Sequence, residues 1–267
     1  MGTHMRGELL KGRWVNICEE SANIGGSWQG RNSDGTPNSW DMELVQFVYE
    51  RLSEKKEPVL VDVGANTGTM SLLAAFLPSL ICYAFEPARY AFELLNRNIC
   101  LNELQSRIIT YNLALSAHRG DSFIYIPADG KGSGLATLSS TPLRFSESKK
   151  EEISLITLDE WMLEVRPKSV DLLKIDTEGH ELFVLQGAQE LLERFSPVIV
   201  LEYWPDNTAQ FGYNPKDIDT FLLKKGYRGY HISKEDKVYV KSKTAYQGTS
   251  QCQHSFTVLT IPRSFDG

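Results

Sequence analysis

The chain has 267 residues and a formal net charge of −6, with 42% hydrophobic and 23% charged residues. This amount of apolar material can form a substantial core, so the composition excludes a disordered chain. The longest apolar run, from Met70 to Leu77, is far shorter than the ~20 residues that cross a bilayer, so we expect no membrane partner. Acidic residues outnumber basic ones by 34 to 28, which disfavours nucleic acid as a partner.

The N-terminal part differs in composition from the rest of the chain. Residues 1–5 resemble a cloning remnant and are left out of the fold prediction. Residues 6–57 are expected to form an N-terminal cap, rich in loops up to residue 39 and ending in a helix from about 41 to 56. The main domain then spans residues 58–267. Four widely spaced cysteines, with no CxxC pair and no secretory signal, predict reduced thiols in a cytoplasmic protein: Cys18, Cys82, Cys100 and Cys252.

Short apolar strands alternate with helices from residue 58 onward. Nearly continuous apolar strands are typical of a parallel sheet that helices cover on both faces. The pattern therefore predicts an α/β fold with a mostly parallel, doubly wound sheet. The expected strands are 59–63, 80–85, 108–111, 171–175 and 198–203. Four helices are expected: one from about residue 69, one after residue 87 that ends at about 102, one over 179–195 and one near 215–225.

Two regions depart from this alternation. Between residues 112 and 156, alternating apolar residues and a glycine-rich turn predict an inserted β segment. Near the C-terminus, strands at 227–233, 237–241 and 256–261 follow one another without helices between them. We therefore expect the sheet to end with antiparallel strands.

A strand that runs into a glycine turn opens the main domain. The segment Val-Asp-Val-Gly-Ala-Asn-Thr-Gly (61–68) leads from strand to helix, and ligands of open α/β sheets bind outside the carboxyl ends of the strands. Glu86 ends the second strand, where an acidic side chain can accept hydrogen bonds from both hydroxyls of a ribose. We interpret this pair as a nucleoside site; a plain glycine connector beside a solvated glutamate is the alternative.

The glycine spacing separates two kinds of nucleoside ligand. A dinucleotide site needs Gly-x-Gly-x-x-Gly, but counting from Gly64 the second and third places hold Asn66 and Thr69. Asn66 tolerates a left-handed turn, yet its side chain would block the close approach of a pyrophosphate. Asp62 adds a negative charge, which suits a cation. The pattern favours S-adenosylmethionine, which carries a ribose, an ammonium and a sulfonium but no phosphate.

A second polar segment, Leu-Lys-Ile-Asp-Thr-Glu-Gly-His-Glu (173–181), follows the fourth strand. Because that strand neighbours the first in the usual strand order, a methyl acceptor is expected here. Asp176, Glu178 and His180 can lie within a few ångströms of one another in such a turn. The same residues also suit a helix start, with Asp176 or Thr177 as N-cap and Glu178 favoured by the helix dipole. Both interpretations can hold together.

Four segments together resemble the FkbM family of S-adenosylmethionine-dependent methyltransferases. They are 61–68, Phe-Glu-Pro (85–87), Asn-Leu-Ala-Leu-Ser (112–116) and Ile-Asp-Thr-Glu-Gly-His-Glu (175–181). Their order and spacing match over about residues 58 to 204. The resemblance implies a Rossmann-like methyltransferase fold and O-methylation of a small-molecule hydroxyl, often on a sugar, a glycoside or a polyketide-type product.

The resemblance also assigns roles to individual residues. It implies cofactor contacts for the turn, for the end of the second strand and for the segment near the adenine: Asp62, Gly64, Ala65, Asn66, Thr67, Gly68, Glu86, Pro87, Asn112, Ala114 and Ser116. Gly-Ser-Gly-Leu (132–135) resembles the family's loop on the substrate side, which makes Ser133 and Leu135 candidate substrate contacts.

Methyl transfer to a hydroxyl needs an aligned acceptor and a group that takes its proton. His180 is the first candidate for this base, because its ordinary pKa of ~6.5 leaves it largely neutral at pH 7. Asp176 is the second candidate, or else it orients the ammonium of the cofactor. Glu178 completes the set of candidate catalytic residues.

Other interpretations of the same residues remain open. Asp176 and Glu202 end neighbouring strands, where some O-methyltransferases hold magnesium against a diol, but no dense ligand motif favours a metal. Glu202 and Trp204 are otherwise candidate substrate contacts. A nicotinamide oxidoreductase shares the sheet but not the glycine pattern, and a non-catalytic cofactor-binding subunit does not require the acidic segment. The methyl acceptor and the oligomeric state do not follow from the sequence.

Overall fold

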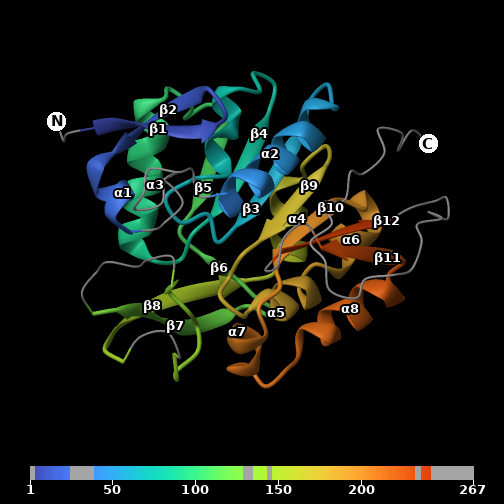
Figure 1. Ribbon diagram of the computed structural model, residues 1–267. Helices are drawn as coiled ribbons and strands as arrows, with labels where there is room; N and C mark the ends of the chain where they lie inside the picture. Colours follow the sequence, from blue (N-terminus) through green and yellow to red (C-terminus); the bar gives the residue numbers. More distant parts are fainter. Residues whose placement is uncertain (1–3, 25–38, 129–134, 143–145, 232–235, 242–267) are drawn as a thin grey trace.

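The computed structural model describes residues 4–24, 39–128, 135–142, 146–231 and 236–241 (Figure 1). A central sheet of seven strands has the order β11-β12-β10-β9-β3-β4-β5. The strands are β3 (Val59–Val63), β4 (Ile81–Phe85), β5 (Ile108–Tyr111), β9 (Leu172–Ile175), β10 (Val198–Glu202), β11 (Tyr227–His231) and β12 (Asp236–Lys241). The five strands from β10 to β5 are parallel, while β12 is antiparallel to both of its neighbours, β10 and β11. The predicted mostly parallel sheet with an antiparallel end is confirmed.

The inserted β segment is also confirmed. It forms a separate sheet in the order β6-β8-β7, drawn below the N-terminal half of the molecule in Figure 1. Its strands are β6 (Ala114–Leu115), β7 (Gly120–Pro127) and β8 (Ser148–Ile156). A small apolar cluster of its own, including Ile124 and Ile153, holds this sheet against the start of the helix that follows β4.

Helices cover the central sheet on both sides, and two apolar clusters fill the space between them and the strands. The helices are α2 (Ser39–Ser53), α3 (Arg89–Leu101), α4 (Leu158–Val165), α5 (Glu181–Gln186), α6 (Gln189–Phe195), α7 (Pro205–Ala209) and α8 (Pro215–Lys224), with a 3-10 turn η2 (Ser71–Ala75) after β3. None of the helices that the structure describes is long and apolar enough to pass through a membrane.

Two predicted helices differ from the observed ones. The helix expected from about residue 69 is only the 3-10 turn η2. The helix expected over 179–195 is divided into α5 and α6 at Gly187, where a Cβ atom would lie 2.0 Å from the Ser116 carbonyl oxygen. A new helix, α6, begins after this break, because the Asp159 carboxylate accepts hydrogen bonds from the amides of Glu190 and Leu191 in its first turn. Helix α4 was missed, although Thr157 and Glu160 form a capping box before it.

The N-terminal region contains more regular structure than we expected. Instead of loops, it forms an antiparallel hairpin of β1 (His4–Leu10) and β2 (Arg13–Cys18), followed by α1 (Glu19–Ile24). The hairpin packs on α3, where buried Asn98 accepts a hydrogen bond from the Cys18 amide and donates to the Thr67 carbonyl oxygen and the Ser21 hydroxyl. The Asn98 side chain therefore links the end of the N-terminal hairpin to the glycine turn.

Parts of two predictions lie outside the described residues: the expected strand at 256–261 and Cys252. The other three cysteines are free thiols, as predicted, with Cys18 and Cys82 buried and Cys100 exposed.

Candidate functional site

The glycine turn after β3 has the backbone shape that its sequence predicts. Gly64 and Asn66 adopt positive φ angles of 72° and 49°, and the amides of Gly64 and Ala65 both donate to the Phe85 carbonyl oxygen. A Cβ atom on Gly64 would lie 1.8 Å from the backbone oxygen of Asp176. The turn after β3 and the segment after β9 are thus in backbone contact, which only glycine permits here.

Glu86 stands at the end of β4 beside this turn, and only 6% of it is exposed. Its two carboxylate oxygens accept hydrogen bonds from the amides of Asn66 and Ala88, at 2.8 and 2.9 Å. Burial raises the pKa of Glu86 to about 7. Asn112 joins the group, because its side-chain amide donates to the carbonyl oxygens of Glu86 and Pro87. The structure therefore brings three predicted cofactor residues together at one strand edge.

Asp62 has a different environment from the one we expected. It is fully buried, and one of its carboxylate oxygens accepts a 2.6 Å hydrogen bond from the Ser71 hydroxyl. The other oxygen lies 3.3 Å from the ammonium nitrogen of Lys174. The cation that Asp62 faces is therefore Lys174 of the neighbouring strand, in direct register with it.

The segment after β9 forms a tight turn that hydrogen bonds to Glu181 stabilise. Glu178 and Gly179 both have positive φ angles, 53° and 103°, which is strained for a glutamate. One oxygen of the buried Glu181 carboxylate accepts hydrogen bonds from the amides of Thr177 and Gly179 and from the Thr177 hydroxyl. The N-cap of α5 is His180 and its side chain makes no capping bond, so the predicted caps, Asp176 and Thr177, were wrong.

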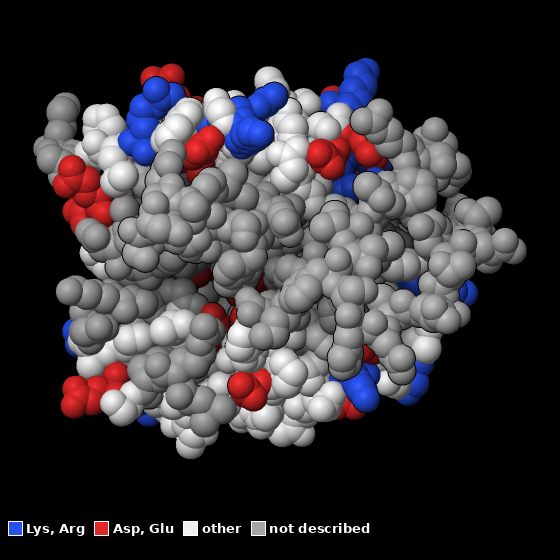
Figure 2. All heavy atoms as spheres, in the orientation of Figure 1, with Lys and Arg blue, Asp and Glu red and all other residues white. Residues whose placement is uncertain are grey.

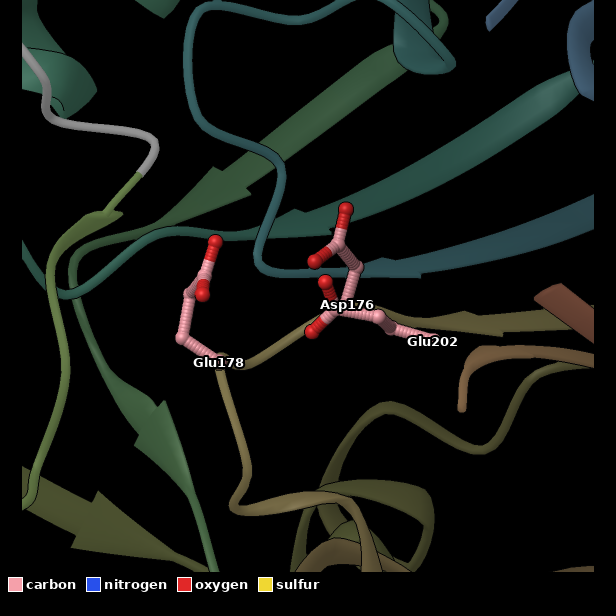
Figure 3. A group of neighbouring side chains, drawn as sticks. All are labelled: Asp176, Glu178 and Glu202. Atoms are coloured by element: carbon pink, nitrogen blue, oxygen red, sulfur yellow. The ribbon is translucent and has the colours of Figure 1, made fainter. Parts of the chain in front are cut away.

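Three carboxylates gather at the carboxyl ends of β9 and β10. Asp176, Glu178 and Glu202 each offer an oxygen within 4.8 Å of the other two (Figure 3). The side-chain nitrogen of Asn207, in α7, donates to both Glu178 and Glu202, at 2.7 and 3.1 Å. Burial and the charges of Asp176 and Glu178 raise the pKa of Glu202 well above its usual value. Figure 2 shows acidic side chains in a hollow near the middle of the face that it draws.

His180 is directed to another side of the turn than these carboxylates. Its Nε2 atom lies 3.0 Å from the Ser116 hydroxyl oxygen, and its ring packs on Phe183 and Phe211. Burial lowers the pKa of His180 to about 4. The expected grouping of Asp176, Glu178 and His180 is therefore replaced by Asp176, Glu178 and Glu202, with His180 paired to Ser116.

The inserted β segment borders the acidic turn. The Thr137 hydroxyl donates to the Glu178 carbonyl oxygen at 3.2 Å, so the chain just beyond Leu135 reaches the expected acceptor side. Leu135 is half-buried, and Ser133 lies outside the described residues. Trp204 is half-buried at the start of α7. Ala114 is buried in the small cluster of the inserted sheet.

Sequence reasoning missed three residues that organise the site: Lys174, Glu181 and Asn207. Lys174 and Glu181 lie inside the quoted acidic segment, and a lysine within an apolar strand was a signal for a buried acidic partner. Asn207 lies in a short helix whose start is marked only by Pro205. Nothing in the sequence relates Asn207 to Glu178, which is 29 positions away.

The fold and this edge of the sheet define a protein class. A mostly parallel seven-stranded sheet, with a glycine turn after β3, an acidic residue after β4 and an acidic turn after the adjacent β9, is a Rossmann-like methyltransferase fold. The Methyltransferase FkbM domain matches residues 62–228. Since this match covers more than half of the chain, the chain belongs to the FkbM family of methyltransferases.

Individual relatives agree with this family. The chain is 29% identical over 217 residues to "Methyltransferase sdnD" of Sordaria araneosa, covering 68% of this chain and 82% of that protein. It is 28% identical over 195 residues to "Hexuronic acid methyltransferase AglP" of Haloferax volcanii, covering 73% and 72%. It is also 28% identical to "2-O-methyltransferase NoeI" of Sinorhizobium fredii, covering 54% and 62%.

Among solved structures, the crystal structure of Methyltransferase FkbM from Methylobacillus flagellatus KT is similar, with 17% identity and a TM-score of 0.47. The similarity covers 69% of this chain but only 43% of that protein.

Proposed function

We propose that this protein is an S-adenosylmethionine-dependent O-methyltransferase that acts on a hydroxyl of a small molecule, such as a sugar, a glycoside or a polyketide-type product. One observation carries the proposal: the glycine turn and the three-carboxylate cluster lie at adjacent strand ends, in backbone contact at Gly64 and Asp176. A donor held by the first and an acceptor held by the second would therefore meet.

The residues at the first turn suit the cofactor. Each oxygen of Glu86 accepts one hydrogen bond from the protein and keeps a lone pair for a ribose hydroxyl. The Asp176 side chain is 48% exposed and would offer negative charge to an ammonium. The bound cofactor supplies the methyl group, and the chain's own residues orient the acceptor and take up its proton.

The acceptor side is acidic and suits an uncharged polyol. Carboxylate oxygens accept hydrogen bonds from several neighbouring hydroxyls, whereas three clustered carboxylates repel an anionic acceptor. The name of one relative, which mentions hexuronic acid, supports a carbohydrate acceptor. A hexuronic acid is anionic, so by the charge argument the acceptor of this chain differs from the one in that name. Within this class we expect neutral sugars or glycosides to be methylated in preference to their carboxylated or phosphorylated forms.

The proton of the acceptor hydroxyl must leave during the transfer. We favour the carboxylate cluster as the proton acceptor, since Asp176 contacts the glycine turn and Glu178 lies in the same cluster. His180 stays in the proposal as an alternative base, with a pKa of about 4 that makes it a weak one. Its pairing with Ser116 also supports a structural role.

A metal-assisted reaction on a diol is the second candidate. The observation in its favour is that three carboxylates from two strand ends share one space. Against it, the Asn207 amide already bridges two of the three, which relieves their repulsion without a metal. Activity that survives excess chelator would decide for the metal-free reaction, and activity that disappears and returns with magnesium would decide for the metal.

The proposal is tested by binding first and by transfer second. We expect S-adenosylhomocysteine to bind in calorimetry and NAD not to bind. We then expect transfer of a labelled methyl group to at least one member of a library of neutral sugars, glycosides and polyketides. Binding of NAD instead would support an oxidoreductase, and cofactor binding without transfer to any hydroxyl would support a non-catalytic subunit.

A further inference from the structure

Lys174 lies in β9 beneath both turns of the site, and its ammonium group contacts both. The nitrogen donates to the Gly64 carbonyl oxygen at 2.7 Å and more weakly to that of Val63 at 3.4 Å. It also lies 3.3 Å from Asp62 and 3.5 Å from Asp176. Two of these contacts are hydrogen bonds and two are ion pairs, so the ammonium group has four oxygen partners from the two strand ends and their turns.

Burying the Lys174 ammonium costs free energy, because a buried charge loses its hydration. The side chain of Lys174 is 7% exposed and that of Asp62 is fully buried. Burial by itself lowers the pKa of Lys174, but the charges of Asp62 and Asp176 outweigh burial and raise it above its usual value, so the group stays an ammonium. An apolar pair in place of a buried ion pair is often equally stable or more so. We therefore expect the buried pair of Lys174 and Asp62 to position the two turns rather than to stabilise the fold.

Lys174 also acts on the part of the site that is open to ligands. The Asp176 side chain is 48% exposed, and one of its oxygens faces the ammonium. Lys174 therefore holds this carboxylate from the protein side while leaving it open to solvent. At the same time it holds the carbonyl oxygen of Gly64 at the first bend of the cofactor turn. One side chain thus ties together the two turns that would carry donor and acceptor.

We propose that Lys174 is a positioning residue for methyl transfer, which fixes the glycine turn against the acidic turn and orients the Asp176 carboxylate toward the bound cofactor. The inference rests on the proposed function. In-line transfer depends on the alignment of donor and acceptor, and a displacement of about 1 Å costs about 100-fold in rate. The backbone hydrogen bonds between β3 and β9 end with that of the Asp176 amide to the Val63 carbonyl oxygen. Lys174 adds a side-chain link between the two turns at this point.

The test uses the pair of residues rather than the lysine alone. Lys174→Met leaves the buried Asp62 carboxylate without its cation and is expected to lower the melting temperature strongly. The double variant Asp62→Asn/Lys174→Met replaces both charges with neutral groups of similar size. Asp62→Asn alone measures how much of the change in kcat and melting temperature comes from the loss of Asp62. Lys225→Met is the matched control, because it removes a lysine whose partner, Glu193, is 70% exposed and lies away from the site.

For each variant the melting temperature, the affinity for S-adenosylhomocysteine, and kcat and KM for the acceptor are measured. We expect the double variant to regain most of the melting temperature lost by Lys174→Met, while its kcat stays about 100-fold below that of the wild type. The control keeps its kcat.

Either of two results would overturn the inference on Lys174 and leave the proposed function intact. One is a double variant that regains both stability and kcat, and the other is an Asp62→Asn variant with a kcat as low as that of the double variant. The first would make Lys174 purely structural, and the second would assign the effect to Asp62. A wild-type protein that neither binds S-adenosylhomocysteine nor transfers a methyl group would overturn the proposed function, and the inference with it.

Discussion

Replacing Glu86 with glutamine should remove a loss of stability that the ligand-free protein undergoes as the pH rises to neutral, while weakening cofactor binding. Burial raises the pKa of Glu86 from 4.5 to about 7, so the folded state binds this proton more tightly than the unfolded state does. As the pH rises from about 4.5 to about 7, the wild type therefore loses stability, and the loss is complete above about 7. Glutamine carries no such charge and avoids this loss.

The size of the effect follows from the same pKa. Each tenfold change in proton affinity is worth about 1.4 kcal/mol, so a rise from 4.5 to about 7 corresponds to about 3 kcal/mol. In a protein of this size, about 2 to 4 °C of melting temperature accompany each kcal/mol. The melting temperature of Glu86→Gln relative to the wild type should therefore rise by about 6 to 12 °C between pH 4.5 and 8.

Glutamine also turns one N–H group toward the amides of Asn66 or Ala88, which costs about 1 to 3 kcal/mol. This cost does not depend on pH, so the slope of the difference, rather than its sign at one pH, is diagnostic. In calorimetry the variant should bind S-adenosylhomocysteine about 10- to 100-fold more weakly, because a charged acceptor for the ribose is lost.

The assay is a set of thermal melts from pH 4.5 to 8.5, with Glu190→Gln as the control at an exposed helix position. If the melting temperatures of the wild type and Glu86→Gln differ by the same amount across this range, burial does not raise the pKa of Glu86. Unchanged affinity for S-adenosylhomocysteine would remove Glu86 from the ribose site.

Three further substitutions test other parts of the site. His180→Phe should reduce the loss of stability between pH 6.5 and 4, because burial keeps the folded pKa of His180 near 4 and the unfolded state takes the proton first; a fall of kcat to background in a stable variant would restore His180 as the base. Gly64→Ala should lose about 2 kcal/mol or more of stability and all cofactor binding, since its Cβ would meet a backbone oxygen at 1.8 Å; wild-type melting and binding would contradict the described turn. Asn207→Ala should lower kcat about tenfold or more by separating the two glutamates that it bridges, whereas Asp206→Asn on the same helix should not; equal activity of both variants would argue against the bridge.

The parallel sheet could be predicted because its strands are buried on both faces. Val59–Val63 is buried throughout, so an apolar run broken only by Asp62 marked the strand and its end at Gly64. The helix after the fourth strand was harder to predict, because its division at Gly187 depends on contact with Ser116, which is distant in sequence. Local sequence patterns thus predicted the strands that are marked by their own apolar residues. They did not predict helix ends that depend on contact with a residue distant in sequence.

The site shows the same division. The turn after β3 and the position of Glu86 followed from strand ends alone. The partner of Asp62 did not, because pairing it with Lys174 requires the register between β3 and β9. The direction of His180 also could not be predicted, since two partners of its ring, Ser116 and Phe211, are distant in sequence.

The bond between Asn98 and the Thr67 carbonyl oxygen has a practical consequence for dissecting this protein. The family match begins at residue 62, so a minimal fragment designed on that match would omit the hairpin that occupies the other side of Asn98. Such a fragment would keep every residue of the glycine turn, yet it would expose the amide that supports the turn from below. Shortened fragments of this protein should therefore keep β1, β2 and α1.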